Sequence, residues 1–400
     1  MRAIKTNLTT LLLWMGFGIF FVGYLVYPGS IERLSIVALT IYLYVFIRYI
    51  NRIRILYVLL GIFFGFLLGS YGLFFFEYRV DENNFRFDVQ KKENTAVLLL
   101  FEGEPSTYDL SLFLKNISQE NDFIYKIRVP FQLHRYKKAY EKMGMSRYAD
   151  ISMEIRNCLS EHLNYGYDVF LGYVSNKPYY GEIFRQKILK ANYQKVIIAP
   201  IDIKDAFTYQ RIIQAVEQES TYFPDFTFKI MPPLWDSYKV AASLVERVCT
   251  INDSMESDEI GIILLNSRKP ENFEELHPDP FVQEQSFMEE LKSIFVANGF
   301  EDRKIKSAAL HALKREIFQR TEELQQYGVE KIYVVSAMNI EEKIDIQYKI
   351  EKLMKKLNRS KGIEMEHIKG WGLEEMFVEE LEYRIRMMNV EIWLEEPEEK

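Results

Sequence analysis

Acidic side chains follow the short apolar runs that we expect to be strands, so they would gather where these strands end. They are Glu102, Glu104, Asp202, Asp205, Glu341, Glu342 and Asp345. Carboxylates bind hard divalent metals, and they also bind iron, although less selectively. One interpretation is an acidic metal site. The alternative is that these are solvated acids of turns and helix starts, where Asp and Glu are common.

Histidines, which act as bases and metal ligands near neutral pH, are few and scattered. They are His134, His162, His277, His311 and His367, and no two share a helix face at ligand spacing. His311 follows a possible strand, so a base there would face the same end of the sheet. We expect His367 in a loop before Trp371. The two cysteines, Cys158 and Cys249, form no CxxC pair and are interpreted as buried small apolar residues.

Strand-like and helix-like segments alternate from residue 96 onward. The predicted strands are 96–101, 168–173, 195–200, 259–265, 305–310 and 331–336. The predicted helices are 108–117, 135–165, 180–191, 207–218, 237–249, 281–298, 314–327, 341–358 and 374–388. This alternation predicts an α/β fold with doubly wound parallel sheets. In such sheets a ligand binds beyond the carboxyl ends of the strands, where the acids lie.

The order of these elements repeats, which predicts two α/β halves that arose by duplication. The expected domains are a transmembrane anchor of three helices at 1–80, a linker at 81–95, a first half at 96–250, a second half at 259–393 and an acidic tail at 394–400.

Three apolar runs precede the α/β region, at 8–27, 34–50 and 55–76. Each is close to the roughly 20 residues that cross a hydrocarbon core as a helix. None has a charge in its middle, which favours an anchor over a transporter. Gly61, Gly65 and Gly69 are spaced so that two spans can pack closely.

Basic residues in the short flanks predict the orientation of these spans. Arg2 and Lys5 precede the first span and three arginines occupy 48–54, whereas the turn at 28–33 has only Arg33. The N-terminus is then cytoplasmic, and the soluble domain lies on the outer face of the cell membrane. Bases at 79–92 oppose this placement. Residues 1–60 carry six Lys/Arg and one acid, so the rest of the chain has a net charge of −12, which argues against a nucleic-acid partner.

Several stretches resemble the ferrochelatase family, within the class of enzymes that insert a metal into a tetrapyrrole without ATP. Residues 97–105 are similar to the family's opening strand and Gly-x-Pro turn, and 169–200 to its second and third strands. Residues 233–245 resemble its inter-domain helix, and 261–270 the opening strand of its second half. The resemblance covers about residues 95–390. It implies a tetrapyrrole such as haem or porphyrin, and a divalent metal such as iron, as ligands.

The chain departs from the family at its active-site positions. The metal-binding histidine of the family follows the third strand, where this chain has Ile201 and then Asp202. The His-Gly turn that opens the second half is replaced by Ser267-Arg268. In the family the region around Tyr125 to Tyr148 is a flexible lip over the porphyrin, and core packing of a helix is the alternative here.

The resemblance implies candidate site residues at matching positions. The proton acceptor, which follows the last strand in the family, would be Glu341, Glu342 or Asp345. The metal ligands would be Asp202 and Glu341. Other ligand-binding candidates at strand ends are Glu102, Tyr173, Ile201, Asp202 and His311.

Three functions are compatible with these observations. The first is a membrane-anchored module that binds a tetrapyrrole or a metal without full catalytic activity. The second is a tethered chelatase that inserts a divalent metal into a porphyrin with carboxylates in place of histidine. The third is a structural or interaction module. No sequence feature supports this function, and the protein partner is unknown. The missing histidine and the outward orientation favour the first.

Overall fold

The computed structural model describes residues 2–49, 55–76, 92–118, 123–204, 227–251, 259–266, 279–391 and 393. The chain forms two compact units. The first contains residues 1–80 and 105–146, and the second contains residues 81–104 and 147–400. Residues 105–146, which we expected to belong to the first α/β half, therefore group with the apolar N-terminal helices. Most of the expected linker and the acidic tail lie outside the described residues.

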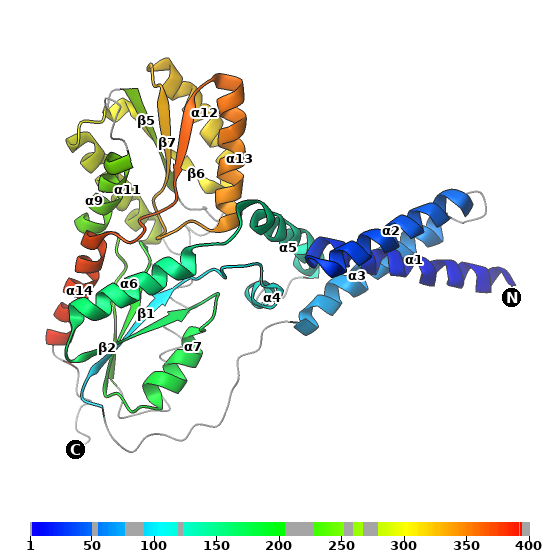
Figure 1. The fold of residues 1–400 in the computed structure, drawn as a ribbon, viewed down its shortest axis with the longest axis horizontal. Coiled ribbons are helices and arrows are strands. Elements are labelled where there is room, and N and C mark those ends of the chain that lie inside the picture. The colour runs from blue at the N-terminus through cyan, green and yellow to red at the C-terminus, as the bar shows by residue number, and fades with distance from the viewer. Residues whose placement is uncertain are drawn as a thin grey trace. The chain divides into compact units, whose positions relative to one another are not determined.

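In the first unit, the regular elements among the described residues are all helices (Figure 1). Its elements are α1 (Arg2–Val26), α2 (Ser30–Tyr49), α3 (Ile55–Gly72), the short η2 (Leu73–Phe76), α4 (Leu110–Ser118) and α5 (Phe123–Met143). Among the residues that the structure describes, three segments are long and apolar enough to cross a membrane: Asn7–Val26, Ser30–Tyr49 and Ile55–Phe76. They match the three predicted spans.

Glycines allow α1 and α3 to pack at short range. A Cβ atom on Gly65 would overlap the backbone carbonyl of Met15, and one on Gly61 would lie 2.5 Å from the carbonyl oxygen of Leu11. Gly18 of α1 is equally close to the backbone of α3 around Ile62. The predicted role of the spaced glycines in close helix packing is thus confirmed.

The prediction of a single helix over 135–165 is wrong, because two helices occupy this stretch. α5 ends at Met143, and α6 (Tyr148–Leu163) begins after a break. Gly144 takes a φ of +86°, a left-handed conformation that suits glycine and ends a helix.

Within its described residues, the second unit contains two four-stranded sheets in which every pairing is parallel. The first sheet has the order β2-β1-β3-β4 and the second has the order β6-β5-β7-β8. The strands are β1 (Thr95–Phe101), β2 (Tyr167–Tyr173), β3 (Lys195–Pro200), β4 (Thr227–Ile230), β5 (Ile260–Asn266), β6 (Ile305–Ala309), β7 (Lys331–Ser336) and β8 (Glu364–Ile368). The second half repeats the strand order of the first, which agrees with the predicted duplication. The predicted α/β fold class is confirmed.

Helices cover both faces of the sheets (Figure 1). They are α6, α7 (Tyr180–Ile183) with the π-turn η3 (Phe184–Leu189), α9 (Tyr238–Ile251), α11 (Asp279–Ala297), α12 (Leu313–Gln326), α13 (Ile344–Lys361) and α14 (Glu375–Val390). The short 3-10 turns are η5 (Asp302–Lys304) and η6 (Leu310–Ala312). The predicted helix at 180–191 is thus short and continues as a π-turn. The predicted helix at 207–218 lies outside the described residues.

One apolar core is shared by the two sheets. Along β1, alternate side chains such as Val97 and Leu99 join this shared core, whereas Leu98 and Leu100 join a separate cluster on the other face. Ile262 of β5 also belongs to the shared core. Strands buried on both faces account for the continuous apolar runs in the sequence.

Candidate functional site

Contacts between loops show that the carboxyl ends of β1 and β7 meet. Glu102, directly after β1, forms an ion pair with Lys343 from the loop after β7. Both carboxylate oxygens of buried Glu104 accept a hydrogen bond from the backbone N–H of Ile344, at 3.1 Å each. Ile344 is the first residue of α13, so Glu104 of one half places its negative charge at a helix N-terminus of the other.

Gly103 makes this meeting of loops sterically possible. Its φ is +82°, and a Cβ atom would lie 2.7 Å from Cδ1 of Tyr173 and 2.9 Å from Cβ of Asn176. Asn176 in turn donates a hydrogen bond from Nδ2 to the carbonyl oxygen of Glu104, at 2.9 Å. The turn after β1 is therefore held tightly against the loop after β2.

The acids after β7 are engaged by neighbouring groups of the fold. Gln347 donates a hydrogen bond to the carboxylate of Glu341 at 3.1 Å, and Asp345 forms an ion pair with Lys349 at 2.7 Å. Glu342 accepts a hydrogen bond from the N–H of Lys343 at 3.0 Å. Burial raises the pKa of Glu341, and it raises the pKa of Glu342 to about 7.

Asp202 lies two residues after the end of β3, and its carboxyl also has a shifted pKa. Burial raises its pKa to about 7, and the negative charge of Glu102 acts in the same direction. The backbone N–H of Lys204 lies 3.4 Å from Oδ1 and opposes this shift. The backbone carbonyl of Asp202 accepts a hydrogen bond from Leu234 at 2.9 Å, which ties the ends of β3 and β4 together.

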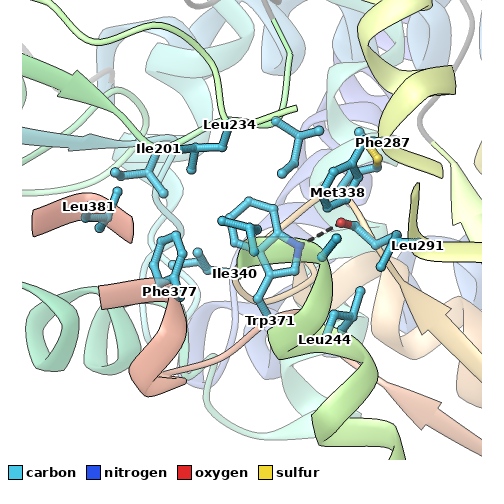
Figure 2. Close-up of a cluster of buried hydrophobic side chains, with 14 of the residues drawn as sticks. Ile201, Leu234, Leu244, Phe287, Leu291, Met338, Ile340, Trp371, Phe377 and Leu381 are labelled. Atoms are coloured by element: carbon cyan, nitrogen blue, oxygen red, sulfur yellow. Dashed lines mark hydrogen bonds between the residues drawn. The ribbon is translucent and has the colours of Figure 1, made fainter. Parts of the chain in front are cut away.

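Ile201, at the position of the family's metal-binding histidine, faces an apolar cluster (Figure 2). The cluster draws residues from both halves, and they include Ile201, Leu234, Leu244, Phe287, Leu291, Met338, Ile340, Trp371, Phe377 and Leu381. Trp371 is 1% exposed and donates its indole N–H to the carbonyl oxygen of Ala337 at 2.7 Å. Ile201 is therefore part of the apolar core. Its hydrocarbon side chain has no atom that could bind a metal or accept a proton as a histidine does.

The remaining ligand-binding candidates differ in what surrounds them. Tyr173 is buried, and its hydroxyl lies 2.6 Å from Oγ of Ser152 and 3.3 Å from the carbonyl oxygen of Ala149. It packs within the first half. His311 lies in η6, directly after β6, but its side chain lies outside the described part of the structure. Asp205 and His277 also lie outside the described residues.

Sequence reasoning missed a polar contact between β7 and β8. His367 lies on β8 rather than in the expected loop, and its Nε2 is 3.0 Å from Oγ of Ser336, the last residue of β7. Ser336 also acts on Glu342, where it opposes the rise in the pKa of that carboxyl. Burial lowers the pKa of His367 to about 3, so its ring is neutral near pH 7. The short alternation of apolar and polar residues over 363–366, Ile-Glu-Met-Glu, is the signal that could have identified this strand, although His367 breaks it.

The described residues do not assemble a site of several metal ligands. Among them, no group of three or more His, Cys, Asp or Glu is placed to hold an ion. The acids instead cap a helix, pair with lysines or bond to amide groups, as described above. The metal-ligand roles of Asp202 and Glu341 therefore stay predictions from the family resemblance.

A comparison with protein-family models gives a match over part of the chain. A family model described as CbiX matches residues 143–251, which run from the end of α5 to the end of α9. A search of curated proteins found no match.

Similar solved structures include chelatases from Bacillus. One is the sirohydrochlorin chelatase SirB from Bacillus subtilis subspecies spizizenii in complex with cobalt, with 9% identity and a TM-score of 0.48 over 73% of this chain and 94% of that one. Another is SirB from Bacillus subtilis with Fe3+, with 12% identity and a TM-score of 0.48 over 74% and 96%. A third is a multi-domain protein of Deinococcus radiodurans described as similar to chelatases, with 10% identity and a TM-score of 0.44 over 72% and 53%.

Proposed function

We propose that this chain is a membrane-anchored protein of chelatase fold that binds a tetrapyrrole, such as haem or a porphyrin, or its metal. The binding region would be the facing carboxyl ends of the strands in the second unit, and binding would occur without metal insertion. The CbiX match over 143–251 and the ferrochelatase-like motifs support the ligand class. The three long apolar helices support the anchor.

The observation that carries the non-catalytic part of the proposal is the environment of Ile201. Metallation needs a base to remove two pyrrole protons and ligands to deliver the metal. At the position where the family has its histidine, Ile201 is packed among Leu234, Phe377 and Leu381 (Figure 2). The nearby acids Glu102 and Glu104 are taken by Lys343 and the start of α13.

Two measurements on the detergent-solubilised full chain test the proposal. Titration with haem is expected to change the Soret band, because the protein alters the environment of a bound macrocycle. Incubation with protoporphyrin and ferrous iron is expected to give metallation at the uncatalysed rate. An unchanged Soret band would contradict binding, and catalysed metallation would contradict the non-catalytic assignment.

A specific observation favours the second candidate, a chelatase that uses carboxylates. Asp202 and Glu342 both have pKa values raised to about 7, so each exchanges a proton near neutral pH as a general base should. For this candidate, iron insertion would be measurable and would be lost in Asp202→Asn or Glu342→Gln. An exposed acid, Glu375, supplies the control substitution Glu375→Gln.

The side of the membrane is part of the same proposal. The flanking arginines favour an outer location for the soluble domain, where it would capture or transfer a tetrapyrrole. A cytoplasmic domain would instead have direct access to biosynthetic substrates, which would favour the chelatase candidate.

A further inference from the structure

Helix α5 presents a continuous row of exposed side chains. Arg128, Phe131, Arg135, Lys138 and Lys142 are all exposed. Their spacing alternates between three and four residues, so they lie on one side of the helix. We call these five residues the basic face of α5. Four of the five are cations, and none of the four forms an ion pair within the part of the chain that the structure describes.

The opposite side of α5 is buried within the first unit. Val129, Leu133 and Ala139 are fully buried. Lys137 is 1% exposed, and its charge is used internally. Its Nζ lies 2.6 Å from the carbonyl oxygen of Tyr24 and 3.1 Å from a carboxylate oxygen of Glu32. The basic face is therefore the side of α5 that stays exposed when the opposite side is buried.

Contacts fix where this face lies along the apolar helices. His134 Nδ1 is 3.1 Å from the carbonyl oxygen of Leu25, one residue before α1 ends. Phe131 packs against Phe66 of α3, with ring centroids 5.6 Å apart. Lys126 lies over the ring of Phe74, at 5.4 Å, where α3 gives way to η2. Thus α5 sits at the end where α1 and α3 finish and α2 begins.

At that end of three spanning helices, a bilayer presents its headgroups. Clustered Lys and Arg next to a membrane span attract anionic lipids, and an aromatic residue among them suits the boundary with the acyl chains. Phe131 is 48% exposed although it contacts Phe66, as expected for a side chain at that boundary.

We propose that the basic face of α5 binds the headgroups of anionic phospholipids, so that residues 105–146 rest on the membrane surface. This inference depends on the proposed anchoring by α1, α2 and α3, but it does not depend on tetrapyrrole binding. Lipid is the favoured partner because the face combines phosphate-binding cations with an apolar side chain beside a membrane span.

The test uses the full chain reconstituted in nanodiscs of phosphatidylcholine, with or without phosphatidylglycerol. Hydrogen–deuterium exchange of α5 reports contact with headgroups. Phosphatidylglycerol is expected to slow exchange in α5, and high salt is expected to reverse this, because the attraction is screened. The second readout is the preference of the chain for spin-labelled phosphatidylglycerol over phosphatidylcholine. Neutralising the basic face should lower this preference by at least about fivefold. A fivefold change corresponds to the contribution of one basic residue near the membrane surface.

The neutralised variant combines Arg128→Gln, Arg135→Gln, Lys138→Gln and Lys142→Gln. A matched control removes four exposed cations from α13 of the second unit, namely Lys352→Gln, Lys355→Gln, Lys356→Gln and Arg359→Gln. The control should keep the response to phosphatidylglycerol. Should the neutralised variant fail to fold, the salt dependence of the unmodified chain decides the question.

Three outcomes overturn the inference. The first is equal exchange of α5 in the two lipid compositions, and the second is an undiminished lipid preference in the neutralised variant. The third is release of the chain from vesicles by alkaline washing. This result would also contradict the proposed membrane anchoring by α1, α2 and α3. Haem titration of the same sample reports separately on the proposed function of the second unit.

Discussion

At the scale of single residues, the facing strand ends use their acids to join the two halves. Glu104 binds the N-terminus of α13, Glu102 pairs with Lys343, and Lys204 after β3 pairs with Glu284 of α11. In the described part of the chain, each of these acids has a partner from the other half. Asp202 and Glu342 differ, because burial leaves both with a pKa of about 7.

Gly103 should be intolerant of a side chain. Replacement by alanine, Gly103→Ala, would force a Cβ atom against Tyr173 and would also strain a backbone with φ of +82°. We expect a loss of about 1–3 kcal/mol in unfolding free energy. Gly328→Ala is the matched control, because its φ is +74° but a Cβ atom would meet nothing within 4 Å. A thermal unfolding midpoint that falls no further for Gly103→Ala than for the control would contradict the steric account.

The carboxyl of Glu342 should make stability depend on pH. Its pKa is about 7 in the folded chain and near 4.5 when exposed, so the folded state binds the proton more tightly. The carboxyl then costs nothing below about pH 4.5 and destabilises the fold increasingly as pH rises toward 7. Glu342→Gln should flatten the dependence of the unfolding midpoint across this window, whereas Glu375→Gln should leave it unchanged. If the unfolding midpoint depended equally on pH in the unmodified chain and in both variants, the raised pKa of Glu342 would be contradicted.

The sequence indicated which acids follow strands, but it could not show their partners. Strand ends were visible from apolar runs such as 331–336, so Glu341 and Glu342 were placed correctly after β7. The contact of Glu104 with Ile344 joins residues that lie 240 positions apart. Contacts of this length depend on the packing of whole halves, which local patterns do not specify.

At the scale of elements, close packing of α1 on α3 organises the first unit. A bulky residue at the contact should separate these helices, so Gly65→Leu is expected to lower the thermal unfolding midpoint of the detergent-solubilised chain. Gly72→Leu is the control, because Gly72 is the last residue of α3 and a Cβ atom there meets nothing within 4 Å. Equal midpoints for the two variants would show that the α1–α3 contact contributes nothing.

Most strands and helices could be predicted because their apolar residues have clear periods. Those missed have particular causes. β4 has only four residues, and β8 carries Glu364, Glu366 and His367, so neither forms an apolar run. The helix expected to start at 341 starts at Ile344, because Glu341 and Glu342 belong to the loop after β7.

At the scale of the whole molecule, a duplicated α/β unit is interrupted by a segment that belongs to the helical unit. Residues 105–146 follow β1 in the sequence, yet they fold with the apolar helices. The strand alternation predicted the duplication. It could not predict this assignment, because the contacts of Lys137 and His134 with the end of α1 carry no local sequence signal.

The orientation of the chain is decided by where its C-terminus lies. The short flanks predict an outer location, so a C-terminal alkaline phosphatase fusion should be active and a fluorescent protein fusion that folds only in the cytoplasm should be dark. The exposed cations of α5 and the bases after the third span favour the opposite side. A bright cytoplasmic fusion with inactive phosphatase would contradict the prediction and favour the chelatase candidate.

The most direct test of the central claim is an absorption titration of the full chain with haem. The account predicts a saturable Soret change that is weakened in a strand-end variant, Glu102→Gln with Asp202→Asn, and is retained in the control Glu351→Gln with Glu375→Gln. A Soret band that stays unchanged on titration, or one that responds equally in both variants, would contradict binding at the facing strand ends.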